Sequence, residues 1–135
     1  MKLNLILLLT ALGFASCATT SDSGTMVVDG KEVEFSADVT SEVDDIEVDH
    51  TLVRQLDGRV SAQFELENDD NSPKRLTITW DWMDSDGIKL REATGEFSEW
   101  SVVLAPDEIR SFTLQSPTEH AIQVKIRVRS TRSTL

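Results

Sequence analysis

The sequence has little of what most catalytic and metal sites require. It contains one cysteine, Cys17, and two histidines, His50 and His120, which are 70 positions apart; tyrosine is absent. A closed structural zinc site needs four soft or borderline ligands, which these residues cannot supply. No serine stands in a Gly-x-Ser-x-Gly setting, and no nucleophile with a neighbouring base can be named. We therefore expect no enzyme activity and no cofactor.

Basic residues are also scarce. Thirteen Lys and Arg stand against 24 Asp and Glu, for a formal net charge of −11. Lys2 is the only charged residue before Cys17, so a chain that begins at Cys17 carries −11 − 1 = −12. Such a surface repels phosphate groups, which predicts no nucleic-acid partner unless a short basic stretch acts locally. An acidic surface is also an ordinary solubilising surface. The basic stretch comprises Lys125, Arg127, Arg129 and Arg132.

Long apolar runs are absent except at the N-terminus. Residues 3–12 are almost wholly apolar, and they follow Lys2 and precede the small residues Gly13, Ala15 and Ser16. A run of about ten residues is too short to cross a bilayer core of roughly 30 Å. It has the length and flanks of the apolar region of a secretory signal. We predict a signal peptide over residues 1–16.

The end of this segment resembles the lipobox of bacterial lipoproteins. Phe14-Ala15-Ser16-Cys17 places an apolar residue and two small ones before a cysteine, with Phe14 where Leu is usual. The resemblance implies that Cys17 is diacylated on sulfur, becomes the N-terminus by cleavage, and is acylated on its new amino group. Two or more acyl chains are needed for lasting attachment to a lipid bilayer. The alternative is a plain signal peptide that happens to contain a cysteine.

The lipoprotein resemblance also predicts a location. Ala18 follows the cysteine, whereas Asp at that place marks inner-membrane retention in enteric lipoproteins. We therefore expect a lipid-anchored protein of the cell envelope at the outer membrane, facing the periplasm. Residues 18–24 are small and polar, so we predict that residues 17–24 are the lipidated cysteine and a flexible tether. The folded domain is then expected over residues 25–135.

The rest of the chain alternates apolar and polar residues in the manner of half-buried strands. Three Asp-Gly pairs, at positions 29, 57 and 86, suit tight turns, and no helical periodicity is evident. These features predict an all-β, antiparallel β-sandwich of about seven strands. Residues 26–35 are predicted to form a hairpin, residues 38–49 a loop and residues 46–55 a strand. The residues that share one face of each expected strand are Val60, Ala62, Phe64 and Leu66; Leu76, Ile78, Trp80 and Trp82; Trp100, Val102 and Leu104; Arg110, Phe112 and Leu114; and Ile122, Val124, Ile126 and Val128. The face that carries Trp80 and Trp82 is expected to point into the core.

The order of motifs in residues 48–129 resembles the YcfL-like family of short bacterial lipoproteins of unknown function. The resemblance rests on residues 64–68, Ser72-Pro73, the Trp80-Asp81-Trp82 strand with its Asp84-Ser85-Asp86-Gly87 turn, Trp100, the turn at residues 104–108, and Ser116-Pro117. It implies an immunoglobulin-like sandwich and no assigned catalytic or binding residues. The sequence departs from the family in having no tyrosine on the tryptophan strand and in its acidic stretch at residues 38–49.

The acidic turn after the tryptophan strand is a candidate cation site. Asp84-x-Asp86-Gly87 has the opening spacing of a calcium loop, and Asp69, Asp70, Asn71 and Asp81 are further oxygen donors. The rest of that loop is missing, because Ile88 stands two positions after Asp86 and Gly95 occupies the place of the closing Glu. We therefore predict a hairpin turn and no metal.

Trp100 is expected to be the exposed tryptophan, since Glu99 and Ser101 flank it. Trp100, Asp84 and Asp86 are thus the candidate partner or ligand surface. The predicted function is a membrane-anchored, non-enzymatic interaction or accessory module that docks on another envelope protein. The alternative is a β-sandwich that binds a small ligand or Ca²⁺ through loop carboxylates.

Overall fold

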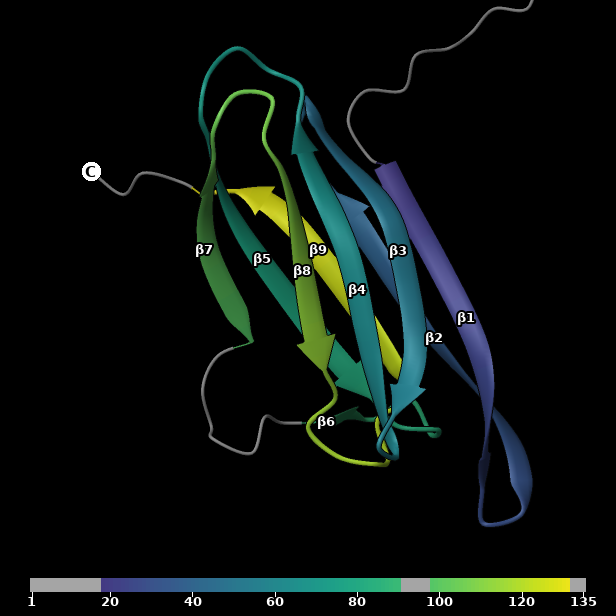
Figure 1. The fold of residues 1–135 in the computed structure, drawn as a ribbon. Helices are drawn as coiled ribbons and strands as arrows, with labels where there is room; N and C mark the ends of the chain where they lie inside the picture. Colours follow the sequence, from purple (N-terminus) through teal and green to yellow (C-terminus); the bar gives the residue numbers. More distant parts are fainter. Residues whose placement is uncertain (1–17, 91–97, 132–135) are drawn as a thin grey trace, which may run out of the picture.

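A computed structural model describes residues 18–90 and 98–131, which form two packed β-sheets and contain no helix (Figure 1). The larger sheet has the order β1-β2-β9-β5, with both β6 and β7 paired to β5, and the smaller has the order β3-β4-β8. The strands are β1 (Ala18–Val28), β2 (Lys31–Ser41), β3 (Ile46–Leu56), β4 (Arg59–Asn68), β5 (Lys74–Met83), β6 (Lys89–Leu90), β7 (Glu99–Leu104), β8 (Ile109–Gln115) and β9 (Gln123–Ser130).

The prediction of an all-β sandwich is confirmed, with two differences in detail. Nine strands occur in the described residues where about seven were expected. Residues 18–24 of β1 and the two-residue β6 lack the alternation of apolar and polar residues that marks a half-buried strand. One neighbouring pair, β2 with β9, is parallel, and the other pairs are antiparallel. Parallel pairing joins segments that are far apart in the chain, so a local turn motif cannot predict it.

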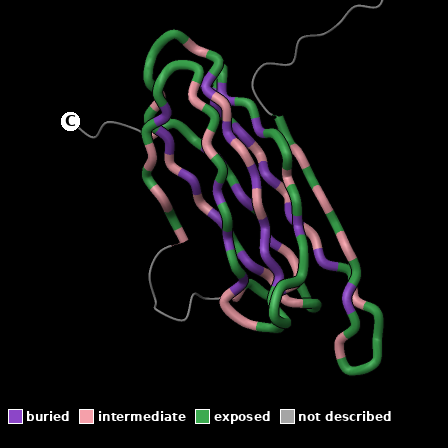
Figure 2. The backbone as a smooth tube through the Cα atoms, viewed as in Figure 1, coloured by how far each residue is buried: buried purple, intermediate pink, exposed green. Residues whose placement is uncertain are grey.

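The core lies between the two sheets and follows the predicted alternation. On β4, Val60, Ala62, Phe64 and Leu66 are each at most 1% exposed. Facing them from β5 are four large side chains, Leu76, Ile78, Trp80 and Trp82, all of which are buried. Buried residues alternate mainly with residues of intermediate exposure along these strands in Figure 2. The inward placement of Trp80 and Trp82 is therefore confirmed.

The predicted flexible tether is wrong, because residues 18–24 belong to β1. This strand pairs with β2 over its whole length, from Ala18 opposite Ser41 to Val28 opposite Lys31. The segment has little to bury, but the backbone of β2 provides a template for it. Polar side chains add hydrogen bonds across the pair: Thr19 Oγ1 lies 3.1 Å from Thr40 Oγ1, and Ser21 Oγ lies 2.6 Å from an Asp38 carboxylate oxygen.

The predicted loop over residues 38–49 is also wrong. β2 continues to Ser41 and β3 begins at Ile46, so only residues 42–45 connect them. Val39 is fully buried and Val48 is 4% exposed, which shows that the acidic residues of this stretch alternate with core residues. The hairpin predicted over residues 26–35 is confirmed, with φ of 51° at Asp29 and 76° at Gly30. The strand predicted over residues 46–55 is confirmed as β3.

Two parts of the prediction fall outside the described residues. Residues 1–17 include the predicted signal peptide and Cys17, and residues 91–97 include Gly95. In the part of the chain that the structure describes, no helix is present that could cross a membrane.

Candidate functional site

The turn between β5 and β6 uses Asp84 to hold its own backbone. Asp84 Oδ1 accepts hydrogen bonds from the backbone N–H groups of Asp86 and Ile88, both at 2.9 Å. The Asp84 N–H donates to the Ile88 carbonyl at 3.0 Å, and Gly87 has a φ of 75°. The hairpin-turn prediction is therefore confirmed. The Asp84 carboxylate is engaged in this turn, which leaves it poorly placed to collect a cation.

Trp100 is not the exposed residue that its neighbours suggested. It lies on the inward face of β7, half-buried, with its ring centroid 4.5 Å from that of Trp80 and 6.1 Å from that of Phe112. Its polar neighbours are on the outward face, because successive side chains of a strand point to opposite sides. Trp100 thus joins the two sheets at the side of the sandwich where β7 and β8 lie.

The structure does not bring Trp100 and the Asp84 turn together. Trp100 is opposite Ile78 on β5, and Asp84 follows six residues further along the chain. At the rise of a β-strand, six residues correspond to about 20 Å. The three residues predicted as one surface therefore belong to two separate places.

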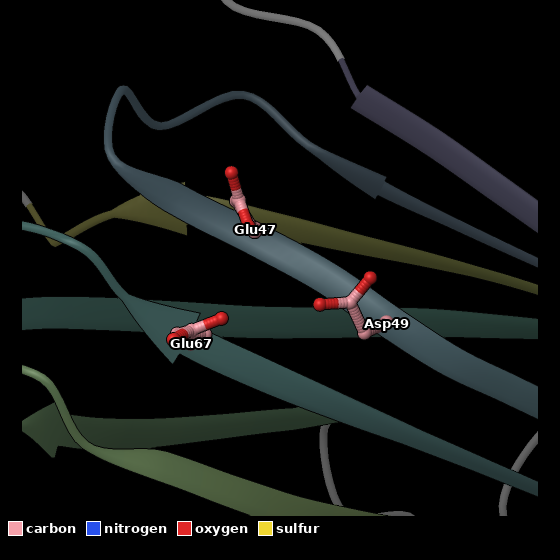
Figure 3. Close-up of side chains that lie close together, drawn as sticks. All are labelled: Glu47, Asp49 and Glu67. Atoms are coloured by element: carbon pink, nitrogen blue, oxygen red, sulfur yellow. The ribbon is translucent and has the colours of Figure 1, made fainter.

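A cluster that the sequence did not reveal lies on the outer face of the smaller sheet. Glu47 and Asp49 on β3 and Glu67 on β4 each offer a carboxylate oxygen, and these atoms lie within 4.8 Å of one another (Figure 3). Glu47 and Glu67 are directly opposite in the β3–β4 register. We call these three residues the acidic cluster. The available signal was the alternation of acidic and apolar residues along both strands.

Repulsion from the nearby Asp69, and then among its own carboxylates, dominates the electrostatics of the acidic cluster. The charge of Asp69 raises the pKa of Glu47, with further contributions from Glu67 and Asp49. The pKa of Glu67 is raised as well, first by Asp69 and then by desolvation and Asp49. The ion pairs within the described residues do not include a cluster member, so the structure leaves this negative charge uncompensated.

The acidic cluster is a weak arrangement for a dedicated metal site. Calcium takes six to eight oxygen ligands in proteins, and magnesium requires near-octahedral geometry. Three carboxylates on an open sheet face, two of them exposed, supply only part of either set. The arrangement suits a cationic partner that covers a broad surface better than a single enclosed ion.

The larger sheet has a shallow polar hollow on its outer face, lined from β1, β2, β5 and β9. Both signs of charge meet there. Arg127 Nε lies 3.3 Å from a Glu42 carboxylate oxygen, and Lys89 Nζ lies 2.7 Å from one of Asp81. Lys125 and Arg127 of the basic stretch line this hollow together with Asp38, Glu42 and Asp81. The hollow therefore contains both signs of charge, in contrast to the acidic cluster.

Asn68 is a second residue that the sequence did not single out. It is fully buried, and its side-chain nitrogen lies within hydrogen-bond distance of the carbonyls of Ser72 (2.9 Å), Leu104 (3.2 Å) and Ala105 (3.2 Å). Its Oδ1 accepts the Asp70 N–H at 3.0 Å. Asn68 thereby fixes the β4–β5 loop and the β7–β8 turn at the end of the sandwich next to the acidic cluster.

Residues 30–130 match the family model described as "Protein of unknown function (DUF1425)". The chain belongs to the DUF1425 family. The segment that carries the YcfL-like resemblance, residues 48–129, lies within the matched region.

A solved relative supports the fold of this family member. A DUF1425 family member from Shewanella sp. PV-4 superposes with a TM-score of 0.57 at 19% sequence identity, over 82% of this chain and 99% of that one. A second structure, Campylobacter jejuni Cj0090, has a TM-score of 0.49 at 18% identity, over 62% of this chain and 85% of that one. No curated protein matches the chain.

Proposed function

We propose that this DUF1425 member is a lipid-anchored envelope lipoprotein of the YcfL-like kind, whose β-sandwich is a non-enzymatic interaction module. The observation that carries the anchor is the motif Phe14-Ala15-Ser16-Cys17 directly after a ten-residue apolar run. Acylation also explains why an exported chain has a single cysteine, since a lone free thiol is a liability in an oxidising compartment. Ala18 after the cysteine favours the outer membrane.

The position of β1 determines how close the sandwich would lie to the membrane. Because β1 begins at Ala18, acyl chains on Cys17 would be separated from the sandwich by almost no free chain. The end of the sandwich at which β1 starts would then lie close to the bilayer. The β1–β2 hairpin turn lies at the opposite end and would point away from it (Figure 1). A domain held this closely presents its sides to neighbouring envelope proteins in a restricted set of orientations.

The interaction role rests on the uncompensated charge of the smaller sheet. A potential of one sign on a flat surface accelerates and orients the approach of an oppositely charged partner. The acidic cluster provides such a surface on the outer face of β3 and β4. We therefore propose another envelope protein, with a basic contact surface, as the partner.

Cation binding is the second candidate function, and one observation favours it. The carboxylates of Glu47, Asp49 and Glu67 converge to within 4.8 Å, whereas the loop carboxylate of Asp84 is engaged in its turn. A cation-binding role would therefore belong to the sheet face rather than to the loops. The calcium experiment in the Discussion separates the two candidates.

Metabolic labelling with a palmitate analogue tests the anchor. The wild-type chain should take up label and sediment with membranes, and Cys17→Ala should take up none, because acylation requires the thiol. Ser23→Ala is the matched control, since Ser23 is exposed on β1. Label that persists in Cys17→Ala, or that is absent from the wild type, would contradict the anchor.

Affinity capture from envelope extract tests the interaction role. A stoichiometric protein partner should be retained by the wild type at low ionic strength and released as salt is raised, because salt screens surface charge. The variant with both Glu47→Gln and Glu67→Gln should retain less of it. Capture that does not respond to salt or to these substitutions would contradict an electrostatic interface on this face.

A further inference from the structure

The two edges of the smaller sheet differ in how they are covered. β3 is one edge, and β1 packs along it: the Val53 N–H donates to an Asp22 carboxylate oxygen at 2.8 Å, and the hydroxyls of Thr20 and Thr51 are hydrogen-bonded. β8 is the other edge. It pairs with β4 on one side and, among the described residues, has no strand on the other.

The register shows which backbone groups of β8 are free. Just beyond its two ends, the Ser116 N–H donates to the Val60 carbonyl at 2.9 Å and the Asn68 N–H to the Glu108 carbonyl at 3.0 Å. In an antiparallel ladder, hydrogen-bonded pairs alternate with non-bonded ones. Even-numbered residues of β8 therefore bond to β4, and odd-numbered residues direct their N–H and C=O groups outward. These are Ile109, Ser111, Thr113 and Gln115.

This free edge has little of the usual protection. Natural edge strands are blunted by charged side chains, proline, bulges, inward-pointing charges or short length, which prevent pairing with another chain. The four residues of β8 whose N–H and C=O groups point outward are exposed and uncharged, and none is proline. The one charged residue of the seven, Arg110, forms an ion pair with Glu108 at 2.6 Å and donates to the Val103 carbonyl. β8 is therefore a template on which a further strand can be added.

The charge beside the edge indicates what kind of strand fits. Ser111 lies opposite Glu65 and donates to its carboxylate at 3.4 Å, and Ile109 lies opposite Glu67 of the acidic cluster. Strands lie about 4.8 Å apart, so a strand added to β8 would be about 10 Å from β4. Because Ser111 and Thr113 are short, a lysine or arginine side chain on the added strand can extend over them toward these glutamates. A second copy of this chain carries the same net charge of −11 and therefore lacks the charge complementarity of a basic partner.

A half-buried tryptophan, Trp100, lies on the inner side of this edge. Trp100 is half-buried beside Phe112, on the side of the sandwich where β8 ends the smaller sheet. Alternate side chains of an added strand would point inward, toward this indole. Trp80 and Trp82 are buried, so Trp100 would be the tryptophan whose surroundings change on binding.

We propose that the free edge of β8 binds an extended, basic segment of a partner envelope protein, which adds to the smaller sheet as a fourth strand. This inference rests on the proposed function, because it assigns the surface and the partner chemistry of the interaction module. Backbone hydrogen bonds would supply much of the affinity, and the glutamates of β4 would select the positive charge.

Three ten-residue peptides test the proposal against the full chain purified from membranes in detergent, with tryptophan fluorescence as the readout. The probe alternates Arg and Thr, the second peptide is the same sequence with the backbone nitrogen of every Arg methylated, and the third alternates Glu and Thr. The second keeps the charge but lacks the N–H groups that would face β8, because the residues whose side chains lie over Ser111 and Thr113 also direct their N–H groups toward β8. We expect the Arg-Thr peptide to bind at least about tenfold more tightly than either of the others. Equal binding of the methylated peptide would overturn edge pairing, and equal binding of the Glu-Thr peptide would overturn the choice of a basic partner.

Two matched pairs of variants locate the binding on β8. Thr113→Pro removes an outward N–H and should weaken binding of the Arg-Thr peptide at least about fivefold, whereas Thr113→Val keeps the N–H and should bind as the wild type does. Ser111→Arg places a competing charge beside Glu65 and should weaken binding comparably. Its control, Ser23→Arg, makes the same change of net charge on the exposed face of β1 and should have little effect. If Thr113→Pro fails to fold, Ser111→Arg and its control Ser23→Arg still test whether the peptide binds at β8.

The outcomes separate this inference from the proposed function. If Thr113→Pro and Ser111→Arg bind the peptide as their controls do, the β8 inference is wrong, even when the chain is acylated and captures an envelope protein by its acidic face. If the chain forms dimers in sedimentation that Thr113→Pro abolishes and Thr113→Val preserves, the occupant is a second copy and the basic-partner proposal is overturned. If no envelope protein is captured, the interaction role fails whatever the peptides do.

Discussion

At the residue scale, Asn68 holds one end of the sandwich together. Asn68→Ala leaves the carbonyls around it without their donor and the Asp70 N–H without its acceptor. Because unsatisfied buried polar groups cost about 1–3 kcal/mol each, we expect a loss of about 2–4 kcal/mol in the free energy of unfolding, measured by urea denaturation. The exposed neighbour Asn71 provides the control, and Asn71→Ala should change stability by less than about 0.5 kcal/mol. Equal stabilities of the two variants would show that the Asn68 network contributes little.

Trp82 is the largest fully buried side chain of the core, at 1% exposed. Trp82→Ala should lower the free energy of unfolding by about 3–5 kcal/mol, since it removes a large buried aromatic and leaves a cavity. Trp82→Phe should cost less, because the indole N–H has no hydrogen-bond acceptor among the described residues and none is lost. Thermal melts followed by circular dichroism measure both. A Trp82→Ala variant that melts within about two degrees of the wild type would place this side chain outside the core.

Residue-level prediction succeeded where a single strand contains the information. The period of two placed Phe64, Leu66 and Trp82 inward from sequence alone, and all three are buried. It failed for Trp100, because the polar neighbours Glu99 and Ser101 lie on the opposite face of the strand and do not report the exposure of Trp100. It gave no indication of Asn68, whose partners Leu104 and Ala105 are 36 and 37 positions away.

At the scale of elements, the acidic residues of β3 and β4 and those of the β4–β5 loop have opposite effects on how stability depends on pH. Neighbouring carboxylates raise the pKa values of Glu47 and Glu67. The ionised forms of these two glutamates therefore destabilise the folded state. Acidification from neutral pH toward their ordinary value of 4.5 removes that repulsion and should raise stability. The pKa of Asp70 is lowered to about 2 by hydrogen bonds from Ser72 and Lys74, so its stabilisation is present above 3.8 and is lost as pH falls toward 2.

The melting temperature should therefore rise between about pH 7 and pH 5 and fall below about pH 4. The variant with both Glu47→Gln and Glu67→Gln should melt higher than the wild type at neutral pH and show a flatter rise. Differential scanning calorimetry across this range at constant ionic strength measures both curves. A wild-type melting temperature that falls steadily from pH 7 to pH 5 would contradict the repulsion assigned to the acidic cluster.

Elements with a clear alternation or a turn signal were predictable, and others were not. The Asp29-Gly30 turn and β3 were predicted because their residues carry local geometric preferences. Residues 18–24 of β1 were missed because these small polar residues gain their order from pairing with β2 and not from burial. The acidic cluster was missed for a related reason, since Glu47 and Glu67 are 20 positions apart and meet only through the β3–β4 register.

At the scale of the whole molecule, calcium should matter little to stability. A metal that binds only the folded state adds about 2.7 kcal/mol at a hundredfold excess over its Kd, which shifts the melting temperature of a domain of this size by several degrees. Because three surface carboxylates hold calcium weakly, we expect nearly equal melting temperatures in millimolar Ca²⁺ and in chelator at matched ionic strength. A rise of several degrees that disappears in Glu67→Gln would contradict this and favour the cation-binding candidate.

The protein that we propose is a sandwich held at the membrane by an acylated Cys17, with one acidic face and one open edge directed at a basic partner. The fold and its core follow from the sequence pattern and the family, whereas the partner surface depends on contacts between strands that are distant in the chain. The proposed orientation of these surfaces in the envelope requires the chain to be attached where β1 begins.

The mass of the N-terminal peptide of the chain purified from membranes tests that attachment most directly. We predict a peptide that begins at Cys17 and carries three acyl chains, two through the sulfur and one on the amino group. A peptide that retains residues before Cys17, or one that begins at or after Cys17 without acyl groups, would contradict the lipid anchor and with it the proposed place of this protein in the envelope.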